Sequence, residues 1–426
     1  MSTKELNYAI KREKSVSVTA SRVSVPPANG SSFSLGQTID LKMPSNMTRG
    51  SYIDFQNSYL KFAISVARPN NSANDDVWLG RNGAYNLIQK IEILSSSATI
   101  SVIDDFNKLS NLFLDSECGT DFKSSVGAVG YGMSTGTVFG QQLTDSTAAS
   151  TNTKKTTFCL PLILTSLFSS TKYIPAFHSD NLTIRITLAS LVEGLLSGTA
   201  VVDGSITINP VSMIYNIVKV TPDAQAMIDS ACGGVYTLVL DDYRSSKYGS
   251  VATGDRTINA NLGFSNQSLS RVLFAFFLPA TELADSQGTR PHRHVSEYCF
   301  QLNGSNYPAV KIKAGFAVLD ENRSEPLAEI RASTRQSGDF QNASSIQPSR
   351  IIDGVGGRQF YEIDLEGLRS GDDGVYSGLY TVGATTSLEV TMNADGANAC
   401  SLGIWANFQA SLTLDTNTDS VFTYSV

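Results

Sequence analysis

The stretch that decides the fold is Phe158–Leu188, FCLPLILTSLFSSTKYIPAFHSDNLTIRITL. It opens with a hydrophobic strand, continues through a turn-rich link that carries aromatic residues, and ends in a strict alternation over Leu182–Leu188. Alternation with a period of two is typical of a β-strand that buries one face. The stretch therefore predicts two strands joined by a long connection.

The same order of features returns about two hundred residues later, in Phe360–Met392, FYEIDLEGLRSGDDGVYSGLYTVGATTSLEVTM. Phe158 and Phe360 are 202 residues apart (360 − 158), and Leu182 and Leu388 are 206 apart (388 − 182). Internal repeats are the first feature to seek in a long chain, because a missed repeat leads to the wrong fold. The similar offsets predict one β-domain that occurs twice.

Three further pairs of segments support this duplication, and they occur in the same order in both halves. Phe62 corresponds to Phe274 with an offset of 212 (274 − 62), and Ile88 corresponds to Val295 with an offset of 207 (295 − 88). The closing strands correspond with an offset of 191 (404 − 213), between the segments that begin at Met213 and Ile404. The chain of 426 residues is long enough for two all-β domains of roughly 200 residues each.

The composition argues against several classes of protein. Charged residues make up 17% of the chain, against about 25% in typical soluble domains, while serine, threonine, asparagine and glycine are abundant. This fits a surface covered by neighbouring molecules better than a free enzyme. No apolar run reaches eighteen residues, so no transmembrane helix is expected. The net charge of −7 argues against a generally basic nucleic-acid-coating surface.

The first 22 residues are an exception to the negative balance, with a net charge of +3 (5 − 2). Two interpretations stay open: a solvated terminus, or an inward-facing arm that meets anionic nucleic acid or lipid. Its first fourteen residues carry the cations Lys4, Lys11, Arg12 and Lys14.

The cysteines indicate reduced thiols rather than a disulfide framework. The five residues are odd in number and far apart, and no CxxC motif occurs. The N-terminus MSTKELNYAIKREK is polar and predicts no signal peptide. We therefore expect synthesis in a cytoplasm.

Several further elements can be predicted from local signals. Apolar residues at helical spacing predict a helix over Asp105–Cys118, with Asp104 or Asp105 as its cap. Thr221-Pro222 followed by Asp223 is a helix start, and Gly233-Gly234 ends that helix. Further expected elements are a hairpin of Tyr85–Leu94 with Thr99–Ile103, a hairpin about Asn303-Gly304, a helix over Pro326–Gln336, a strand over Val235–Leu240, a polar segment over Asp241–Asp255, and loops over Gly119–Lys155 and Ser337–Gly357.

No active site can be recognised in the sequence, so we expect no catalytic, cofactor-binding or metal-binding residues. The histidines are His178, His292 and His294, and no cysteine or acid stands at a paired metal-ligand spacing beside Pro291-His-Arg-His294. Neither a nucleophile elbow nor a phosphate-binding glycine loop is present. The chain is therefore not expected to be an enzyme.

The acidic pairs and the two tryptophans are alternative candidate sites. The acidic pairs lie in predicted turns, where aspartate bends the backbone, although a loop Ca²⁺ site at Asp372-Asp373 stays an alternative. Trp78 and Trp405 are candidates for a sugar site, but Trp405 lies in an alternating strand that predicts a core position. The remaining acidic pairs are Asp75-Asp76, Asp104-Asp105 and Asp241-Asp242.

Two consecutive β-sandwiches with a helix in one connection of each resemble the double jelly-roll major capsid proteins of tailless icosahedral DNA viruses, the lineage of adenovirus hexons, virophages and polinton-like viruses. The resemblance spans roughly residues 15–420. It rests on the duplication, the strand Ile53–Phe62, the strand Ile88–Ile93 with its serine turn, and the connector Thr221–Asp229. The fold class that it implies is all-β: two eight-stranded jelly rolls with short helices in the connections.

The resemblance implies a major capsid protein that trimerises into pseudo-hexameric capsomers and tiles a virion shell. It implies contacts with other capsomers, with penton and minor capsid proteins, and between the inward-facing arm and a membrane or genome, without a small-molecule substrate or cofactor. Loops at Gly119–Lys155 and Asp320–Gly357 would form towers or trimer contacts. Another virion protein, such as a single-jelly-roll capsid, penton or spike protein, and a carbohydrate-binding or glycoside-processing sandwich remain as alternatives.

On this interpretation the chain divides into five parts. They are an N-terminal arm (1–14), a first jelly roll (15–221), a connector helix (222–234), a second jelly roll (235–415) and a C-terminal tail (416–426).

Overall fold

The computed structural model describes most of the chain. The described residues are 18–66, 76–95, 99–118, 120–135, 139–144, 154–170, 172–179, 182–197, 206–279, 290–291, 293–314, 316–317, 320–321, 324–333, 359–367, 378–393, 399–415 and 421–425. The N-terminal arm, His292 and Asp372-Asp373 lie outside them.

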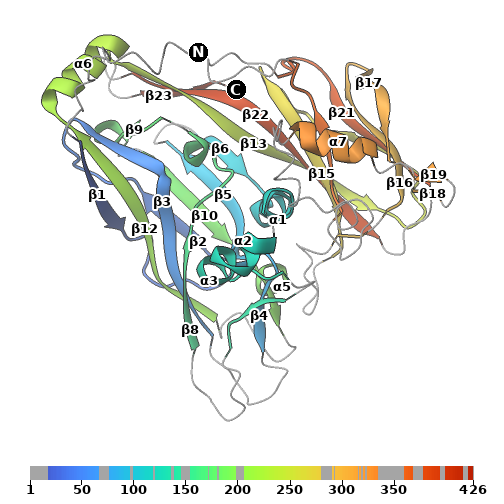
Figure 1. Ribbon diagram of the computed structural model, residues 1–426, viewed down its shortest axis with the longest axis horizontal. Coiled ribbons are helices and arrows are strands. Elements are labelled where there is room, and N and C mark those ends of the chain that lie inside the picture. The colour runs from blue at the N-terminus through green and yellow to red at the C-terminus, as the bar shows by residue number, and fades with distance from the viewer. Residues whose placement is uncertain are drawn as a thin grey trace, which may run out of the picture.

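The first jelly roll consists of two antiparallel sheets that face each other (Figure 1). One sheet has the order β1-β12-β3-β8, with the short β9 (Ile174–Pro175) paired to β3. The other sheet has the order β2-β10-β5-β6. The strand bounds are β1 Val18–Val25, β2 Thr38–Lys42, β3 Ser51–Val66, β5 Ile88–Leu94, β6 Thr99–Ile103, β8 Lys154–Leu160, β10 Thr183–Leu188 and β12 Ile206–Val220.

The second jelly roll repeats this arrangement strand for strand. Its sheets have the orders β13-β22-β15-β20 and β14-β21-β16-β17, so each strand occupies the place of its counterpart in the first half. The predicted duplication is thereby confirmed, and the segments matched in the sequence lie on equivalent strands. The bounds are β13 Val235–Val251, β14 Thr257–Asn261, β15 Leu269–Phe277, β16 Val295–Leu302, β17 Ser305–Lys313, β20 Tyr361–Asp364, β21 Thr386–Met392 and β22 Cys400–Asp415.

The alternating residues found in the sequence form the two cores. In β10 Ile184, Ile186 and Leu188 are buried while their neighbours are partly exposed, and Leu388 and Val390 of β21 behave in the same way. Each sheet contributes such an inward face, and burial of these apolar faces drives the sandwich together.

The hairpin and helix predictions are largely confirmed. β5 pairs with β6, and β16 pairs with β17 across Asn303-Gly304, whose φ angles of 51° and 80° are those of a two-residue hairpin turn.

Helix α1 covers Phe106–Glu117 and helix α7 covers Ser324–Ser333. The two helices follow equivalent hairpins but pack differently, because α1 lies on β5 and α7 lies on β20. Asp105 is the N-cap residue of α1, yet its side chain makes no capping hydrogen bond and instead pairs with Lys108.

Helix α6 (Pro222–Cys232) joins the two halves as the sequence predicts, with Thr221 as N-cap and Gly233 in the left-handed conformation at its end. It is bonded to both jelly rolls. Tyr52 of β3 donates to Gln225 Oε1 at 2.8 Å, and Tyr236 of β13 donates to Asp229 Oδ1 at 2.6 Å. The connector is therefore held to both halves by side chains as well as by its backbone.

The predicted exposed loop over Gly119–Lys155 is wrong for its described part. It contains α2 (Thr120–Ser124), α3 (Val126–Tyr131) and β7 (Phe139–Gln142), and Met133 and Leu143 are buried. Its glycines serve close packing: a Cβ at Gly140 would lie 2.4 Å from the carbonyl oxygen of Gly80. Strand β7 pairs with β4 (Val77–Gly80), which also pairs with β11 (Leu195–Ser197).

Two further expectations are corrected. The sequence predicts a polar segment over Asp241–Asp255 between strands, but most of it continues β13, which runs to Val251 and pairs with β22. The C-terminal tail over 416–426 contains β23 (Val421–Ser425), which pairs with β22. In both places the residues are too polar to show the apolar alternation that predicts a strand, although the backbone pairs with β22.

The remaining described elements are short connections: η2 (Gly83–Leu87), α4 (Ser166–Ser169), η3 (Ala176–His178), α5 (Leu191–Gly194), β18 (Phe316–Ala317) and β19 (Asp320–Glu321). Among the described helices none has the length and apolar character needed to cross a bilayer.

Candidate functional site: the seam between the two jelly rolls

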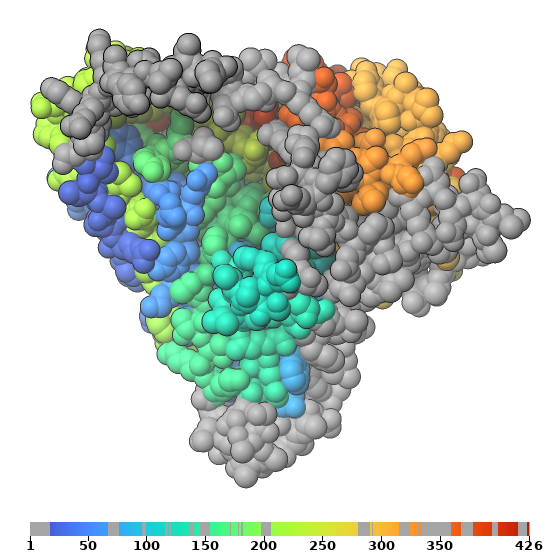
Figure 2. All heavy atoms as spheres, in the orientation of Figure 1, coloured from blue at the N-terminus to red at the C-terminus, as the bar shows by residue number. Residues whose placement is uncertain are grey.

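The two jelly rolls meet across an apolar surface, which we call the seam. In the sheet β13-β22-β15-β20, strand β15 is buried on both faces: Phe274 and Phe276 belong to the core of the second jelly roll, whereas Leu273 and Phe277 belong to the same apolar cluster as the first jelly roll. Figure 2 shows the first half, coloured blue to green, beside the second half, coloured yellow to red. Domains move relative to each other by default unless their interface is large and hydrophobic, so this seam favours a fixed arrangement.

Trp405 is at the centre of the seam. It is 1% exposed, donates from Nε1 to the carbonyl oxygen of Asp104 at 3.4 Å, and makes an edge contact with Phe277 at 5.9 Å between ring centroids. Its ring also requires the absence of a side chain at Gly403, where a Cβ would lie 2.5 Å from the indole. The Nζ of Lys108 on α1 lies 5.4 Å from the centre of the Phe277 ring.

A buried ionic cluster crosses the seam beside α1. Asp115 Oδ2 accepts hydrogen bonds at 2.6 Å from Arg81 and, across the seam, from Arg290. Asp115 Oδ1 accepts from Lys123 Nζ at 3.0 Å. The side chains of both arginines and of Asp115 are fully buried, and that of Lys123 is 3% exposed. Charges taken out of water in this way depend on their partners.

The cluster continues through hydrogen bonds on both sides. Arg290 donates from Nε to the carbonyl oxygen of Gln359 at 2.8 Å, and Lys123 donates to Asn82 Oδ1 at 3.0 Å. Asn82 donates in turn to Asn111 Oδ1 on α1 at 2.5 Å. These bonds tie η2, α1, α2 and the second jelly roll into one network.

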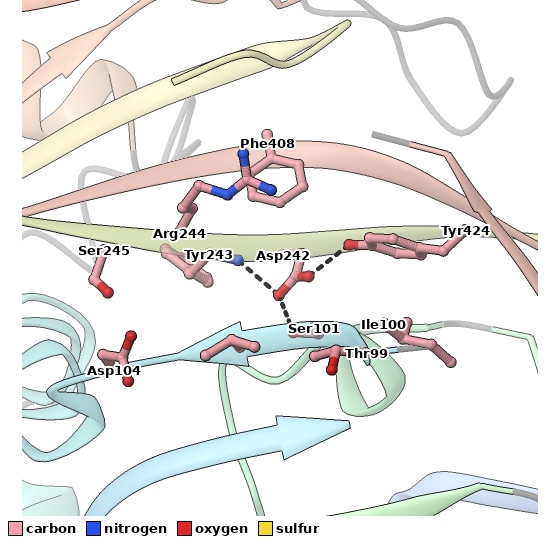
Figure 3. A pocket seen from close by; sticks show the side chains of 11 residues that line it. Thr99, Ile100, Ser101, Asp104, Asp242, Tyr243, Arg244, Ser245, Phe408 and Tyr424 are labelled. Atoms are coloured by element: carbon pink, nitrogen blue, oxygen red, sulfur yellow. Dashed lines mark hydrogen bonds between the residues drawn. The ribbon is translucent and has the colours of Figure 1, made fainter. Parts of the chain in front are cut away.

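Asp242 forms a second polar contact across the seam (Figure 3). Its Oδ1 accepts from Ser101 of β6 at 2.8 Å and from the backbone N–H of Tyr243 at 2.8 Å, and its Oδ2 accepts from Tyr424 of β23 at 2.5 Å. Three segments distant in sequence thus meet at one carboxylate: β6 of the first jelly roll, β13, and the C-terminal strand.

Burial raises the pKa of Asp242 from 3.8 to about 6, against the opposing effects of the hydrogen bonds from Tyr424 and Ser101 and the charge of Arg244. Burial also raises the pKa of Tyr424, and the neighbouring Asp242 adds to that rise. Beside the carboxylate lies a pocket of about 310 Å³, lined among others by Thr99, Asp104, Arg244 and Phe408. The guanidinium of Arg244 lies 5.8 Å from the centre of the Phe408 ring.

The raised pKa makes a testable prediction for Asp242→Asn. The folded chain binds the Asp242 proton more tightly than the unfolded chain, so its stabilising contribution is complete below pH 3.8 and is lost as the pH rises through 6. Asparagine keeps an acceptor for Ser101 and removes the buried charge. When the pH is raised from 4 to 8, we expect the free energy of unfolding of the variant to rise by about 2 kcal/mol relative to that of the parent. This figure takes roughly 1.4 kcal/mol per pKa unit and subtracts an allowance for the weaker hydrogen bonds that asparagine accepts.

Urea unfolding of the variant and the parent at both pH values measures this difference. Asp255→Asn, an exchange on a surface turn outside the seam whose carboxylate accepts from the backbone of Ala252, is the control. A stability difference for Asp242→Asn that is the same at pH 4 and pH 8 would contradict the assignment.

The structure separates the candidate residues named from the sequence. Trp405 is buried, as predicted, and cannot present its ring to a sugar, whereas Trp78 lies partly buried in β4. Asp242 is not in a turn but in the middle of β13. His178 lies in η3 and His294 precedes β16, in different jelly rolls. Within the described ranges no group of three histidine, cysteine or acidic side chains is placed to hold a metal ion.

Sequence reasoning missed the ionic cluster altogether. Arg81 and Arg290 lie 34 and 175 positions from Asp115 in sequence, and no spacing rule connects them. One local signal was available: Asp115 stands in α1 on the face that carries the buried Leu112, where an acid needs a partner.

Comparison with known proteins finds similar folds over nearly the whole chain. No protein-family model matches it, and no curated protein matches it. Solved structures do match, among them a quasi-atomic model of the PBCV-1 virus capsid, with 12% identity, a TM-score of 0.63 and coverage of 97% of this chain and 98% of that chain. The Faustovirus major capsid protein matches with 10% identity, a TM-score of 0.60 and coverage of 94% and 91%.

The mavirus major capsid protein matches with 11% identity, a TM-score of 0.53 and coverage of 98% of this chain and 94% of that chain. These identities are too low to carry function, but the match in fold covers both halves of the chain. Together with the two matching strand orders, it shows that this chain has the double jelly-roll fold of viral major capsid proteins.

Proposed function

We propose that this chain is the major capsid protein of a tailless icosahedral DNA virus, and that it trimerises into pseudo-hexameric capsomers that tile the shell. The observation that carries the proposal is the pair of jelly rolls with identical strand order, held together by a buried seam. Three copies supply six similar domains, and six similar domains around one axis fill a hexagonal lattice position.

The seam supports this role physically. A capsomer built from two-domain chains keeps its shape only if the two domains of each chain keep a fixed orientation relative to each other. The indole of Trp405, the Asp115 cluster and the Asp242 contact each join the halves with buried groups. When rigid copies of a chain meet through a heterologous contact, they form a closed ring if the rotation between neighbours closes, and an open filament if it does not.

The proposal includes a purely structural role without catalysis, and a place in the virion shell. It also includes contacts with penton and minor capsid proteins. The positive N-terminal arm, with Lys4, Lys11, Arg12 and Lys14, would meet a membrane or the genome. Burial of Trp405 counts against the alternative of a sugar-binding sandwich that relies on this ring.

Native mass spectrometry of the purified chain tests the proposal. A trimer has a mass of 137 kDa (3 × 45.7), and a trimer or larger closed assemblies are expected. A chain that stays monomeric at high protein concentration would refute a capsomer.

A further inference from the structure

Strand β23 lies at the end of the chain and is attached to its sheet along one side. It pairs with Ser411–Asp415 of β22, and in the described part of the chain it pairs with no other strand. In contrast, β13 pairs with β22 along most of its length, and β6 is paired with β5. Short segments at a chain end open locally at the lowest free energy, so β23 can leave the sheet without unfolding the rest.

Tyr424 is the side chain that holds β23 on the seam. It packs against the apolar clusters of both jelly rolls. Its hydroxyl donates to Asp242 Oδ2 at 2.5 Å, and the other oxygen of that carboxylate accepts from Ser101 at 2.8 Å. Figure 3 shows Asp242 between Tyr424 and Ser101. Ser425 adds a long hydrogen bond from Gln267 Nε2, at 3.4 Å. The attachment of β23 to the seam therefore depends on Asp242.

The carboxylate of Asp242 is kept from water in part by β23 itself. Asp242 is 1% exposed, and Tyr424 lines the pocket of about 310 Å³ beside it. The groups that donate to Asp242 in the described part of the chain are two hydroxyls and a backbone N–H, none of them a cation. A buried carboxylate with neutral partners favours its protonated form, and water that enters when Tyr424 leaves would favour the charged form.

The charged groups around Asp242 come from the strands that line the pocket. On β13, the exposed Arg244 attracts the charge of Asp242, and Asp241 is the preceding residue. After β6, Asp104 lines the pocket and pairs with Lys90 of β5 at 3.2 Å. The attraction from Arg244 is outweighed by burial, which is the largest influence on the proton of Asp242.

The two tyrosines beside Asp242 do not compete for this proton. Burial raises the pKa of Tyr243 and the pKa of Tyr424 above the usual 10, so both stay neutral near pH 6. The other residues of β6 and β22 that line the pocket, among them Thr99, Ser101 and Phe408, carry no charge.

We propose that β23 is a pH-dependent strap, which closes over the seam while Asp242 is protonated and leaves β22 once Asp242 is charged. When closed, the strap joins both jelly rolls through Tyr424. When open, it uncovers the backbone of Ser411–Asp415 and lets water into the pocket beside Asp242. Every group in this strap belongs to one chain, so its action does not depend on the proposed capsomer.

Burial sets the direction of the pH dependence. It raises the pKa of Asp242 from 3.8 to about 6, and the hydrogen bond from Tyr424, which favours the charged form, has a smaller effect. The closed strap therefore binds the proton more tightly than the open one. Closure is favoured in acid and is lost as the pH rises through 6.

Hydrogen–deuterium exchange of the full chain at pH 5 and pH 7.5 tests the strap. The protection of the amides of Val421–Ser425, corrected for the intrinsic exchange rate at each pH, is expected to fall about five- to tenfold at pH 7.5. The upper figure follows because pH 5 lies one unit below the pKa of about 6, and each unit changes the ratio of closed to open chains about tenfold. The amides of Tyr236–Leu240, which pair with the other side of β22, are the internal reference and are expected to keep their protection.

Two matched variants assign the effect to Asp242. In Asp242→Asn the side chain carries no charge at either pH, so the strap is expected to stay closed and the protection of Val421–Ser425 to be independent of pH. Asp104→Asn removes the other carboxylate that lines the pocket and is the control. It is expected to keep the pH dependence of the parent.

Tyr424→Phe separates a strap held through Asp242 from a strand held by packing alone. It keeps the ring and removes the donor. The loss of protection is expected to be larger at pH 7.5, where the hydroxyl of the parent donates to a charged carboxylate, than at pH 5.

Two results would refute the strap. One is equal protection of Val421–Ser425 in the parent at pH 5 and pH 7.5, and the other is a pH dependence that survives in Asp242→Asn. Neither result bears on the capsomer, which native mass spectrometry tests separately.

Discussion

Replacing Asp115 by alanine is expected to lower the free energy of unfolding by about 3–5 kcal/mol, the range found when one partner of a buried ion pair is removed. The carboxylate accepts from Arg81 and Arg290 at 2.6 Å each and from Lys123 at 3.0 Å. Without it, three buried cations lie together with less compensation, in a site where the two arginines are fully buried. Urea unfolding followed by circular dichroism measures the loss.

Asp115→Asn sharpens this experiment. It keeps the shape and one acceptor oxygen but removes the charge, so a loss close to that of alanine assigns the effect to the charge rather than to the space. Asp223→Asn on the exposed first turn of α6 is the control, with an expected loss of about 0.5 kcal/mol from its interaction with the helix N-terminus. A loss below about 1 kcal/mol for Asp115→Ala would show that the cluster does not hold the seam.

Trp405→Ala is expected to cost about 3–5 kcal/mol, the usual cost of removing a buried tryptophan. The indole contacts Phe277 edge-on, reaches the backbone of Asp104 in the other jelly roll, and fills the space left by Gly403. Truncation leaves a cavity in the seam that the flanking sheets cannot close without moving. Thermal and urea unfolding of the variant give the magnitude.

Tyr380→Ala is the matched control for this prediction. Tyr380 is also aromatic but 61% exposed, so its loss is expected to stay within about 0.5 kcal/mol. Equal effects of the two substitutions would mean that Trp405 does not anchor the seam.

The duplication could be predicted from the sequence because burial on one face of a strand leaves a local trace. Leu182–Leu188 and Leu388–Met392 alternate, and both form strands in equivalent places of their sheets. The helix start at Thr221-Pro222 and the hairpin turn at Asn303-Gly304 could also be predicted, since each constrains the backbone locally.

The seam could not be predicted, because its signals are distributed along the chain. Asp241-Asp242 resembles a turn, yet β22 pairs with the backbone there and Ser101 and Tyr424 satisfy the carboxylate of Asp242. The glycines of the segment after α1 resemble a loop, yet Gly140 packs against the backbone of Gly80. In each case the deciding partner lies far away in sequence.

The edge strands show what the duplication adds. Within one chain β13 and β6 cover each other, whereas β1 and β17 stay exposed at the two ends. An exposed strand edge invites association, and natural proteins cover or protect it.

Electron microscopy of the purified particles, averaged along their symmetry axis, tests the central claim most directly. A ring of three chains that shows six similar lobes in a hexagonal outline is the result that this account predicts. Particles with two lobes, or two-fold dimers without a hexagonal outline, would contradict it.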